Sequence, residues 1–401
     1  MKILMINKFL YPNGGSETYI FELGKQLVQM GHEVQYFGME HSGRIVGNRV
    51  GSYTSSMDFH TGKIQKIFYP FKIIYSVEAR KKLRKVLDDF EPDVVHLNNF
   101  NFQLTPSVIY EIRSWEKIHK KKIRLIYTAH DYQLICPNHM MRLPLSGENC
   151  EQCINDGFLC CSRNRCIHNS KVKSILGTIE GKIYAVLGTY RELDCIICPS
   201  QFMKKKLDCN PIFASKTVVL HNFIPEVPQI NSEKRNYVLY FGRYSKEKGV
   251  DTLLKVCKKL SDIPFVFAGN GPLEEEVSRV SNVANRGFLS GNELYKTIAE
   301  AAFSIYPSEW YENCPFSVME SIALGTPVVG ADIGGIPELI DDRKTGMLFQ
   351  SKNVEELEQV VRTLWMDGKI LFDYTQNCHE KGFDSIVEYC EKLLKAYNGI
   401  G

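Results

Sequence analysis

Short apolar runs, rich in β-branched residues, alternate with longer segments of helical periodicity along the whole chain. Short apolar runs bounded by turn residues are typical of strands buried on both faces, and the segments between them are long enough for helices. This alternation predicts parallel sheets joined by crossover helices. The predicted strands are Ile3–Ile6, Glu33–Phe37, Val94–Leu97, Leu125–Ala129, Asp194–Cys198 and Thr217–Leu220 in the first half, and Val238–Phe241, Phe265–Ala268, Phe303–Tyr306, Pro327–Val329 and Met347–Phe349 in the second.

Two doubly wound α/β domains account for all of these strands. A chain of 401 residues is long enough for two cores of roughly 150 to 200 residues each. The linker is predicted at 224–236, where proline, asparagine and serine interrupt both periodicities. The predicted domains are therefore 1–223 and 237–380. Residues 381–401 form a C-terminal helix that either stays with the second domain or crosses back to the first.

The chain begins with the apolar run Met1–Ile6, which Asn7 and Lys8 cut short. The run therefore predicts a buried strand rather than a signal peptide. No stretch approaches the roughly 18 uncharged apolar residues that a membrane-spanning helix needs. Thirteen cysteines without a secretion signal predict a reducing compartment, so the protein is expected in the cytoplasm.

Charge is divided unevenly along the chain, although the net charge is only +3. The first 200 residues hold 26 Lys and Arg against 19 Asp and Glu, whereas the remainder holds 23 against 27. The basic excess indicates either solvated helix faces or peripheral docking on an anionic membrane at the inner face of the plasma membrane. No groove-reading motif accompanies it, so no nucleic-acid partner is predicted. The basic clusters are Lys81, Lys82, Arg84 and Lys85, then Lys120, Lys121 and Lys122, and then Lys204, Lys205 and Lys206.

Two glutamates stand eight residues apart after a predicted strand that ends near Pro307. Glu312 lies in the following loop, and Pro315 occupies the first position of a predicted helix, which places Glu320 on its early turns. The helix N-terminus would offer N–H groups to a phosphate while the two carboxylates accept hydrogen bonds from sugar hydroxyls. Two exposed glutamates without a binding role are the alternative.

The stretch Trp310–Glu320 resembles the Glu-x7-Glu signature of family 4 retaining glycosyltransferases of the GT-B fold. Four other stretches resemble motifs of the same family in the same order, namely Gly14–Glu17, Phe241–Gly249, Ala268–Pro272 and Gly334–Glu338. Together they span nearly the whole chain. The resemblance implies two Rossmann-like domains that face each other across a cleft, with the nucleotide-sugar donor in the second and the acceptor in the first.

The resemblance also assigns roles to individual residues. Arg243 and Lys248 would bind the donor diphosphate, where fixed cations stabilise the charge that builds up on the leaving group. Two such cations replace a divalent metal, so no cofactor is expected for catalysis. Glu312 would contact hydroxyls of the transferred sugar and Glu320 the ribose, so that neither is a general base and the departing phosphate oxygen takes the acceptor proton. The other implied donor-binding residues are Gly14, Gly15, Asn270, Gly271, Asn313, Cys314, Pro315 and Phe316.

Two further groups fall in the first predicted domain. Gly14 and Gly15 follow the first strand and precede a helix that Ser16 is expected to cap, so backbone N–H groups could approach a phosphate closely. A simple turn is the alternative. By resemblance, His130 would face the donor sugar as a catalytic residue, whereas a histidine that only caps its strand is the alternative. Asp131 is expected to contact the acceptor.

Six cysteines crowd an insertion predicted over residues 136–170. A C-x2-C pair within it has the spacing of half a zinc knuckle. A structural zinc, disulfides and free thiols all remain open for this segment. Because long loops over a sheet edge often bind ligands, we expect the insertion near the acceptor. The candidate zinc ligands are Cys150, Cys153, Cys160, Cys161 and Cys166.

The sequence thus predicts a retaining glycosyltransferase that moves a sugar from a nucleoside-diphosphate sugar, most simply a UDP-sugar, to a saccharide or lipid-linked oligosaccharide in cell-surface polysaccharide biosynthesis. A sugar-nucleotide 2-epimerase shares the architecture, but it needs no acceptor and lacks the Glu-x7-Glu and Arg/Lys set. A non-catalytic nucleotide-sugar-binding protein would keep the fold but should have lost Arg243, Lys248 or Glu312. All three residues are present.

Overall fold

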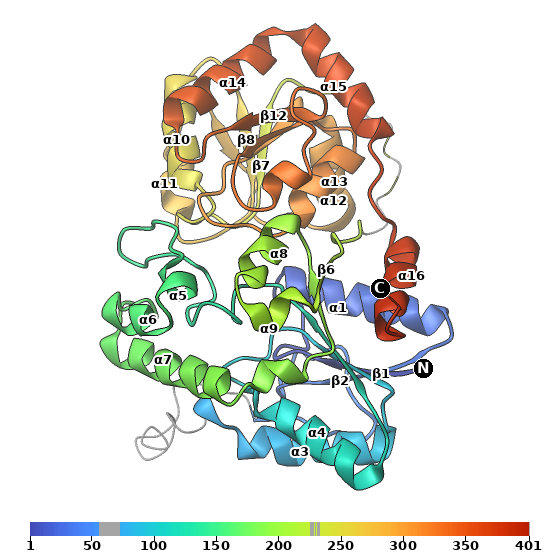
Figure 1. Ribbon diagram of the computed structural model, residues 1–401. Coiled ribbons are helices and arrows are strands. Elements are labelled where there is room, and N and C mark those ends of the chain that lie inside the picture. The colour runs from blue at the N-terminus through green and yellow to red at the C-terminus, as the bar shows by residue number, and fades with distance from the viewer. Residues whose placement is uncertain (56–72, 225–227, 229, 231–232, 401) are drawn as a thin grey trace. The chain divides into compact units, whose positions relative to one another are not determined.

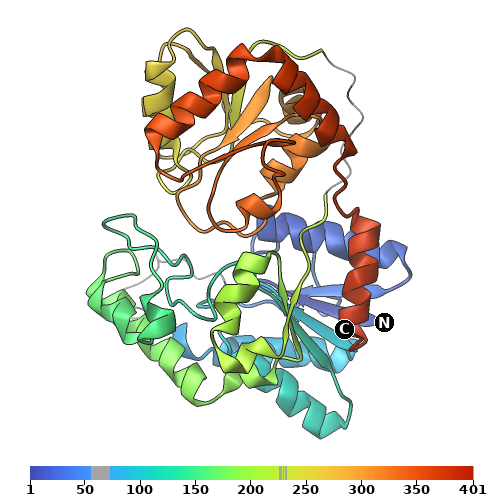
Figure 2. The same cartoon turned by 45° about the horizontal axis from the view of Figure 1, so that its top comes forward.

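The computed structural model describes residues 1–55, 73–224, 228, 230 and 233–400. The chain divides into two units, one made of Met1–His221 with Ile386–Gly401 and the other of Asn222–Ser385 (Figures 1 and 2). Each unit holds a six-stranded sheet in which all neighbouring strands run parallel. The predicted class of two doubly wound α/β domains is confirmed.

The first sheet has the strand order β2-β1-β3-β4-β5-β6. Its inner strands are buried at nearly every position, as expected for a parallel sheet covered by helices on both faces. The strands are β1 (Lys2–Ile6), β2 (Glu33–Phe37), β3 (Val94–Leu97), β4 (Arg124–Thr128), β5 (Cys195–Cys198) and β6 (Thr217–Val219), and the helices are α1 (Gly15–Gln29), α3 (Val77–Phe90), α4 (Ser107–His119), α5 (Gln152–Asn155), α6 (Leu159–Arg163), α7 (Lys171–Val186), η1 (Thr189–Glu192), α8 (Gln201–Asp208), α9 (Pro211–Ala214) and α16 (Ile386–Tyr397).

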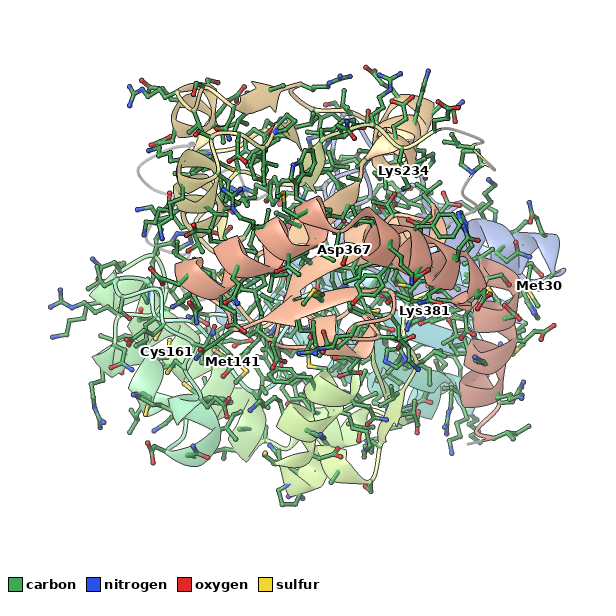
Figure 3. The ribbon with its side chains drawn as sticks, turned by 90° about the horizontal axis from the view of Figure 1, so that it is seen from above. Met30, Met141, Cys161, Lys234, Asp367 and Lys381 are labelled. Atoms are coloured by element: carbon green, nitrogen blue, oxygen red, sulfur yellow. The ribbon has the colours of Figure 1, made fainter. Side chains whose placement is uncertain are left out.

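The second sheet has the strand order β12-β11-β10-β7-β8-β9. Figure 3 labels Asp367 at the turn between its two last helices, where the Asp367 carboxylate accepts hydrogen bonds from the first N–H groups of α15. The elements are β7 (Val238–Phe241), α10 (Val250–Lys259), β8 (Phe265–Ala268), α11 (Glu274–Ser278), β9 (Val283–Asn285), α12 (Gly291–Glu300), β10 (Phe303–Tyr306), α13 (Phe316–Ala323), β11 (Val328–Ala331), η2 (Ile336–Glu338), β12 (Gly346–Phe349), α14 (Val354–Met366) and α15 (Gly368–Glu380).

Each sheet has a point where the chain changes its direction of travel across the strands. This switch lies between β1 and β3 in the first unit and between β7 and β10 in the second. Loops that follow the two strands at a switch diverge toward opposite faces of the sheet and leave room for a ligand at the carboxyl edge. The topology therefore selects the loops after β1, β3, β7 and β10 as the places to look for chemistry.

Every predicted strand is present, with bounds that differ by at most two residues. The pattern missed β9, a three-residue edge strand whose positions are only partly buried or exposed. Such a short edge strand contains no continuous apolar run, which is the signal that identified the other strands. The second unit begins at Asn222, just before the linker predicted at 224–236, and within it the Ile224 N–H donates to the Asp384 carbonyl at 2.9 Å.

The C-terminal helix α16 packs in the first unit, beside α1 (Figures 1 and 2). The Tyr389 hydroxyl lies 2.8 Å from that of Tyr19 on α1, and the Tyr397 hydroxyl lies 2.7 Å from Nδ1 of His96 on β3. Nε2 of His96 in turn lies 2.7 Å from the Thr128 hydroxyl at the end of β4. The helix is therefore part of the first unit's core, joined to it by buried hydrogen bonds as well as by apolar packing.

We expect Tyr389→Ala to lower the free energy of unfolding of the first unit by about 3 kcal/mol, because it removes a buried ring and leaves the Tyr19 hydroxyl with one partner fewer. Unfolding in urea, monitored by hydrogen–deuterium exchange of peptides from α1 and β4, measures the change. Val387→Ala, on the solvent side of the same helix at 43% exposure, is the control. Equal effects of the two substitutions would show that α16 does not contribute to this core.

Candidate functional site

The second unit brings a lysine and a glutamate together at its topological switch. Lys248 lies in the loop after β7 and Glu312 in the loop after β10, and Nζ of Lys248 is 2.6 Å from Oε1 of Glu312. The Lys248 ammonium also donates to the Tyr306 hydroxyl at 3.2 Å. The structure thus joins two residues that the sequence singled out separately, although 64 positions separate them.

Glu312 is buried and its carboxylate receives several donors. Besides Lys248, the Ser308 hydroxyl donates to Oε1 at 3.0 Å and the Trp310 indole N–H donates to the same oxygen. Buried carboxylates are tolerated when charge-assisted hydrogen bonds replace their water. These contacts fix the Glu312 side chain before any ligand arrives.

Lys248 remains a cation in this setting. Burial alone would lower its pKa, but the adjacent Glu312 carboxylate outweighs burial and raises the Lys248 pKa above its usual range. The rings of Tyr306 and Trp310 lie 5.6 and 5.4 Å from Nζ, which adds cation–π attraction. A preorganised positive charge therefore stands at the carboxyl edge of the sheet, where a developing anion could use it.

Glycines allow the loops of this site to touch backbone to backbone. A Cβ on Gly249 would stand 1.9 Å from the Pro307 carbonyl oxygen, and one on Gly334 would stand 2.4 Å from that of Glu312. Both glycines have positive φ values, which other residues adopt only with strain. The loop after β7 can approach Pro307, and the loop after β11 can approach Glu312, only because these two positions lack side chains.

Arg243 lies in the same loop as Lys248 but has the opposite surroundings. Its side chain is exposed, and its guanidinium makes no ion pair or hydrogen bond with the residues that the structure describes. The neighbouring loop after β8 is held close, since the Tyr244 N–H donates to the Asn270 carbonyl at 2.7 Å and a Cβ on Gly271 would collide with the Tyr244 backbone. Arg243 is thus a cation available to a ligand on a firmly held loop.

The helix that carries Glu320 begins one residue later than predicted. Pro315 is the N-cap rather than the first helical residue of α13, and it offers no side-chain cap to the N–H groups of Phe316 and Ser317. Asn313 and Phe316 are half-buried beside it. Cys314 instead turns into the core, where its thiol accepts from the Asn222 backbone N–H at 3.3 Å and its carbonyl from the Asn222 side-chain amide at 2.8 Å.

Glu320 contrasts with Glu312. It is half-buried on α13, and its carboxylate has no hydrogen bond or ion pair with any described residue. Burial without a partner raises the pKa of Glu320 to about 7. A carboxylate in this state gains most from hydroxyl donors that a ligand would bring.

In the first unit, His130 follows β4 and is oriented by Asn98, which follows β3. Nε2 of His130 lies 2.8 Å from Oδ1 of Asn98, and the Asn98 amide donates to the His96 carbonyl, so its oxygen faces the histidine. The Tyr19 ring packs edge-on against His130 at 4.8 Å. Burial lowers the pKa of His130 to about 4, so the imidazole is neutral near pH 7.

Gly14 and Gly15 begin helix α1 as expected, but Ser16 is not its cap. Gly14 occupies the N-cap position, and the Ser16 hydroxyl donates instead to the buried Glu17 carboxylate at 2.9 Å. Glu17 also accepts from the Asn7 amide at 2.9 Å. A helix that starts with glycine leaves its first N–H groups without a side-chain cap, which keeps them open to an anion.

Asp131 is held within its own loop. Its Oδ1 accepts from the Gln133 N–H at 2.9 Å, and its Oδ2 lies 3.5 Å from Nδ1 of His139. Burial would raise the pKa of Asp131, but His139 and the N–H donor lower it below the usual range. The carboxylate therefore shapes the loop after β4, and a contact between Asp131 and an acceptor stays a prediction.

The cysteine insertion runs from β4 to α7 and contains the short helices α5 and α6, with Cys161 labelled in Figure 3. All thirteen cysteines are free thiols, and four of them form two pairs within hydrogen-bonding reach, Cys136 with Cys153 and Cys161 with Cys166. Across the described residues, no three His, Cys, Asp or Glu side chains are placed to hold a metal ion. The five predicted ligands are thus not gathered as a group, and the structural zinc stays a prediction.

Sequence reasoning did not single out the amides that organise the first unit, and it included the acid, Glu17, only as the last residue of the Gly14–Glu17 motif. Asn7, Glu17, Asn98 and Asn99 all lie at the carboxyl edge, and the Asn99 N–H donates to Oδ1 of Asn7 at 3.0 Å. A signal was present, because two asparagines directly follow the buried strand Val94–Leu97. Polar residues at the end of a parallel strand deserve the same weight as a motif.

Comparison with known families covers almost the whole chain. A family described as "Glycosyltransferase Family 4" matches residues 13–226, and one described as "Glycosyl transferases group 1" matches residues 224–385. An "Uncharacterized 42.6 kDa protein in cps region" of Klebsiella pneumoniae is 23% identical over 422 residues that cover all of both chains. The "O-antigen chain mannosyltransferase C" of Escherichia coli is 20% identical over 427 residues, which cover 99% of this chain and 97% of that protein.

Solved structures with low sequence identity share the fold. Sucrose-phosphate synthase from Thermosynechococcus elongatus superposes with a TM-score of 0.69 at 15% identity, covering 100% of this chain and 98% of that one. HepE from Anabaena in complex with UDP-glucose gives a TM-score of 0.66 at 16% identity, with both chains covered completely. At these identities the likeness concerns the architecture, and the site has to be argued from its residues.

We expect Glu320→Gln to stabilise the protein at alkaline pH. Burial raises the pKa of Glu320 from 4.5 to about 7. Ionisation of Glu320 therefore lowers the free energy of unfolding progressively as pH rises from 4.5 to 7, and the full destabilisation is present above pH 7. Glutamine does not ionise, so the variant should melt a few degrees higher than the wild type at pH 8 and at the same temperature near pH 4.5. Differential scanning calorimetry measures this, with the exposed Glu276→Gln as control. A pH-independent difference would contradict the assignment.

Proposed function

Because the chain belongs to glycosyltransferase family 4, we propose that it transfers a sugar from a UDP-sugar to a saccharide or lipid-linked oligosaccharide, with retention of configuration at the anomeric carbon. The enzyme is a glycosyltransferase of the GT-B fold. The observation that carries the proposal furthest is the Lys248–Glu312 pair at the switch of the second sheet, with Arg243 exposed in the same loop. The HepE complex with UDP-glucose supports UDP as the nucleotide.

The cations of the second unit suit a leaving diphosphate. Cleavage of the glycosidic bond moves negative charge onto the phosphate oxygen, and cations fixed in advance stabilise that charge more in the transition state than in the ground state. Donor binding would let the diphosphate share Lys248 with Glu312 and engage the Arg243 guanidinium. In this proposal the phosphate oxygen then takes the proton of the attacking hydroxyl, so no carboxylate has to act as a general base.

The two glutamates bind different parts of the donor in this proposal. Glu312 keeps the Ser308 and Trp310 donors when Lys248 turns to the diphosphate, so its carboxylate stays oriented and accepts hydrogen bonds from hydroxyls of the transferred sugar. Glu320 has no partner among the described residues to give up, and the two ribose hydroxyls would supply donors to its carboxylate. Positioning, rather than proton transfer, is therefore the contribution proposed for both residues.

His130 would act as a neutral hydrogen-bonding group. Its pKa of about 4 means that it adds no positive charge near neutral pH, so the role proposed for it is hydrogen bonding to a sugar hydroxyl. Asn98 holds one of its nitrogens and thereby sets the plane of the ring. This orientation suits selection among sugar hydroxyls.

We place the reaction in cell-surface polysaccharide biosynthesis, at the inner face of the plasma membrane. The relatives from a cps region and from O-antigen synthesis support this setting.

A thermal-shift panel of UDP-, GDP-, ADP- and CDP-sugars tests the donor, because a ligand of the native state raises the melting temperature by mass action. The largest shift is expected with a UDP-sugar, and no shift with any of the four would overturn the donor assignment. Conversion of the donor without acceptor would instead indicate an epimerase.

Two substitutions in one loop should separate activity from stability. Arg243→Ala should lower kcat/KM by about 100-fold and leave the melting temperature unchanged, because its side chain is exposed and has no ion pair with a described residue to lose. Lys248→Ala should lower kcat/KM at least as much and also lower the melting temperature, because it leaves the buried Glu312 charge without its cation. Initial rates with a UDP-sugar, together with calorimetry, measure both. Lys255→Ala, exposed on the following helix, is the control, and wild-type rates for Arg243→Ala would refute the diphosphate role.

A further inference from the structure

Helix α7 of the first unit carries an unusual amount of exposed apolar surface. It follows the cysteine insertion and lies at the edge of its unit with α6 beside it (Figures 1 and 2). Six aliphatic residues, here called the α7 stripe, are exposed along the helix and its C-terminus, from 37% for Ile183 to 86% for Val186. They recur at intervals of three and four, so they share one face. The α7 stripe comprises Val172, Ile175, Ile179, Ile183, Val186 and Leu187.

The face that α7 turns inward is the more polar one. Its buried residues are Ser174, Gly177, Thr178, Glu180 and Tyr184, and none of them is aliphatic. The glycine permits close packing, because a Cβ on Gly177 would stand 2.4 Å from Ile167 of the insertion. A surface helix of a globular domain normally turns its aliphatic residues to the core. The pattern of α7 is reversed, so the hydrophobic effect acts on its outer face and favours a partner there.

The charges on this outer face have one sign. Lys171, Lys173 and Lys182 are exposed on α7, whereas its single acidic residue, Glu180, is buried. At 100° per residue the α7 stripe covers about 120° of the helix surface. Lys171 and Lys182 flank it on one side and Lys173 on the other. Long basic side chains on both edges of an apolar stripe can reach up to phosphates while their stems stay in contact with the apolar layer.

We propose that the α7 stripe docks on an anionic lipid bilayer, with the helix lying in the plane of the membrane surface. The aliphatic side chains would enter the boundary between headgroups and acyl chains, and the flanking lysines would bind lipid phosphates. No helix in the described part of the chain is long and apolar enough to span a bilayer, and α7 has only 16 residues. The proposed contact is peripheral, because 16 residues are too few to cross a bilayer.

Charge favours this occupant over a second copy of the chain. Two copies that paired their α7 stripes about a twofold axis would bring the lysines at one end of each helix close to Lys182 at the other end of its partner. The exposed part of α7 offers no acidic residue to neutralise them. An anionic bilayer offers both an apolar acyl-chain region for the α7 stripe and negatively charged headgroups for the lysines.

Membrane docking adds to the proposed function, and it rests on that function only for the purpose that docking would serve. An enzyme that adds sugars to a lipid-linked acceptor gains from being held at the surface where that acceptor lies, since search is confined to two dimensions. Binding to vesicles needs neither donor nor acceptor. Failure of membrane docking can therefore be told apart from failure of the transfer reaction.

Sedimentation with extruded vesicles tests the inference. The full-length protein should sediment with phosphatidylcholine vesicles that contain about one third phosphatidylglycerol, and binding should weaken as salt is added. The variant Val172→Ser/Ile179→Ser/Val186→Ser should bind at least about tenfold more weakly, because it removes three aliphatic groups from the α7 stripe. The variant Lys171→Glu/Lys182→Glu should lose the preference for vesicles that contain phosphatidylglycerol.

Controls keep the outcome decisive. Val28→Ser, on α1 of the same unit with 54% exposure, should bind vesicles like the wild type. All variants should keep the wild-type melting temperature and the stabilisation by a UDP-sugar, which shows that the fold and donor site are intact. A wild type that ignores anionic vesicles, or a triple serine variant that binds them equally well, would overturn the proposal. So would a wild-type dimer, in light scattering without lipid, that the triple serine variant converts to monomer.

Discussion

The direction of the strands governs where this protein can place chemistry. In a parallel sheet every strand ends at the same edge, and at the switch point the two central loops separate to opposite faces. Lys248 and Glu312 meet because β7 and β10 are neighbours at the switch of the second sheet. Asn7 and Asn99 meet for the same reason after β1 and β3 in the first. Residues far apart in the chain are therefore brought together by topology before any side chain contributes.

Within that frame, the second unit gives its two glutamates different electrostatic environments. Glu312 is surrounded by donors and a cation, whereas Glu320 is half-buried with no described partner and has a pKa near neutrality. The first arrangement stabilises a charge in the ligand-free protein, and the second leaves a charge to be stabilised by whatever binds. An unsatisfied group that lowers stability is a common property of binding sites, where function and stability compete. The two glutamates are thus not described as an acid and a base. The Glu312 carboxylate already accepts its hydrogen bonds from the protein, whereas the Glu320 carboxylate has no donor among the described residues.

The sequence was informative where one physical requirement dominates. Burial on both faces gave the strands continuous apolar runs, and close backbone contact requires the glycines Gly249 and Gly334, which belong to the motifs. It was less informative where a side chain could serve either of two neighbours, as with Ser16, which binds Glu17 instead of capping α1, and Cys314, which faces the core. Asn98 was overlooked because its role depends on a strand pairing with β4 that no local pattern encodes. The α7 stripe was overlooked for another reason, since an apolar helical period is normally assigned to the core and only exposure in the folded chain reverses that assignment.

Helix α16 closes the first unit with residues that come after the whole of the second unit in the chain. During synthesis, β1 to β6 leave the ribosome long before Tyr389 and Tyr397, and residues 222–385 emerge in between. Until then Tyr19 and His96 lack their partners on α16, and the surface of α1 that this helix covers remains open. The first unit therefore cannot be completed until the whole second unit has been synthesised, although domains generally fold N-terminal first. The second unit can fold before α16 has been synthesised, whereas the Tyr19 ring, which packs against His130, gains its hydroxyl partner on Tyr389 only afterwards.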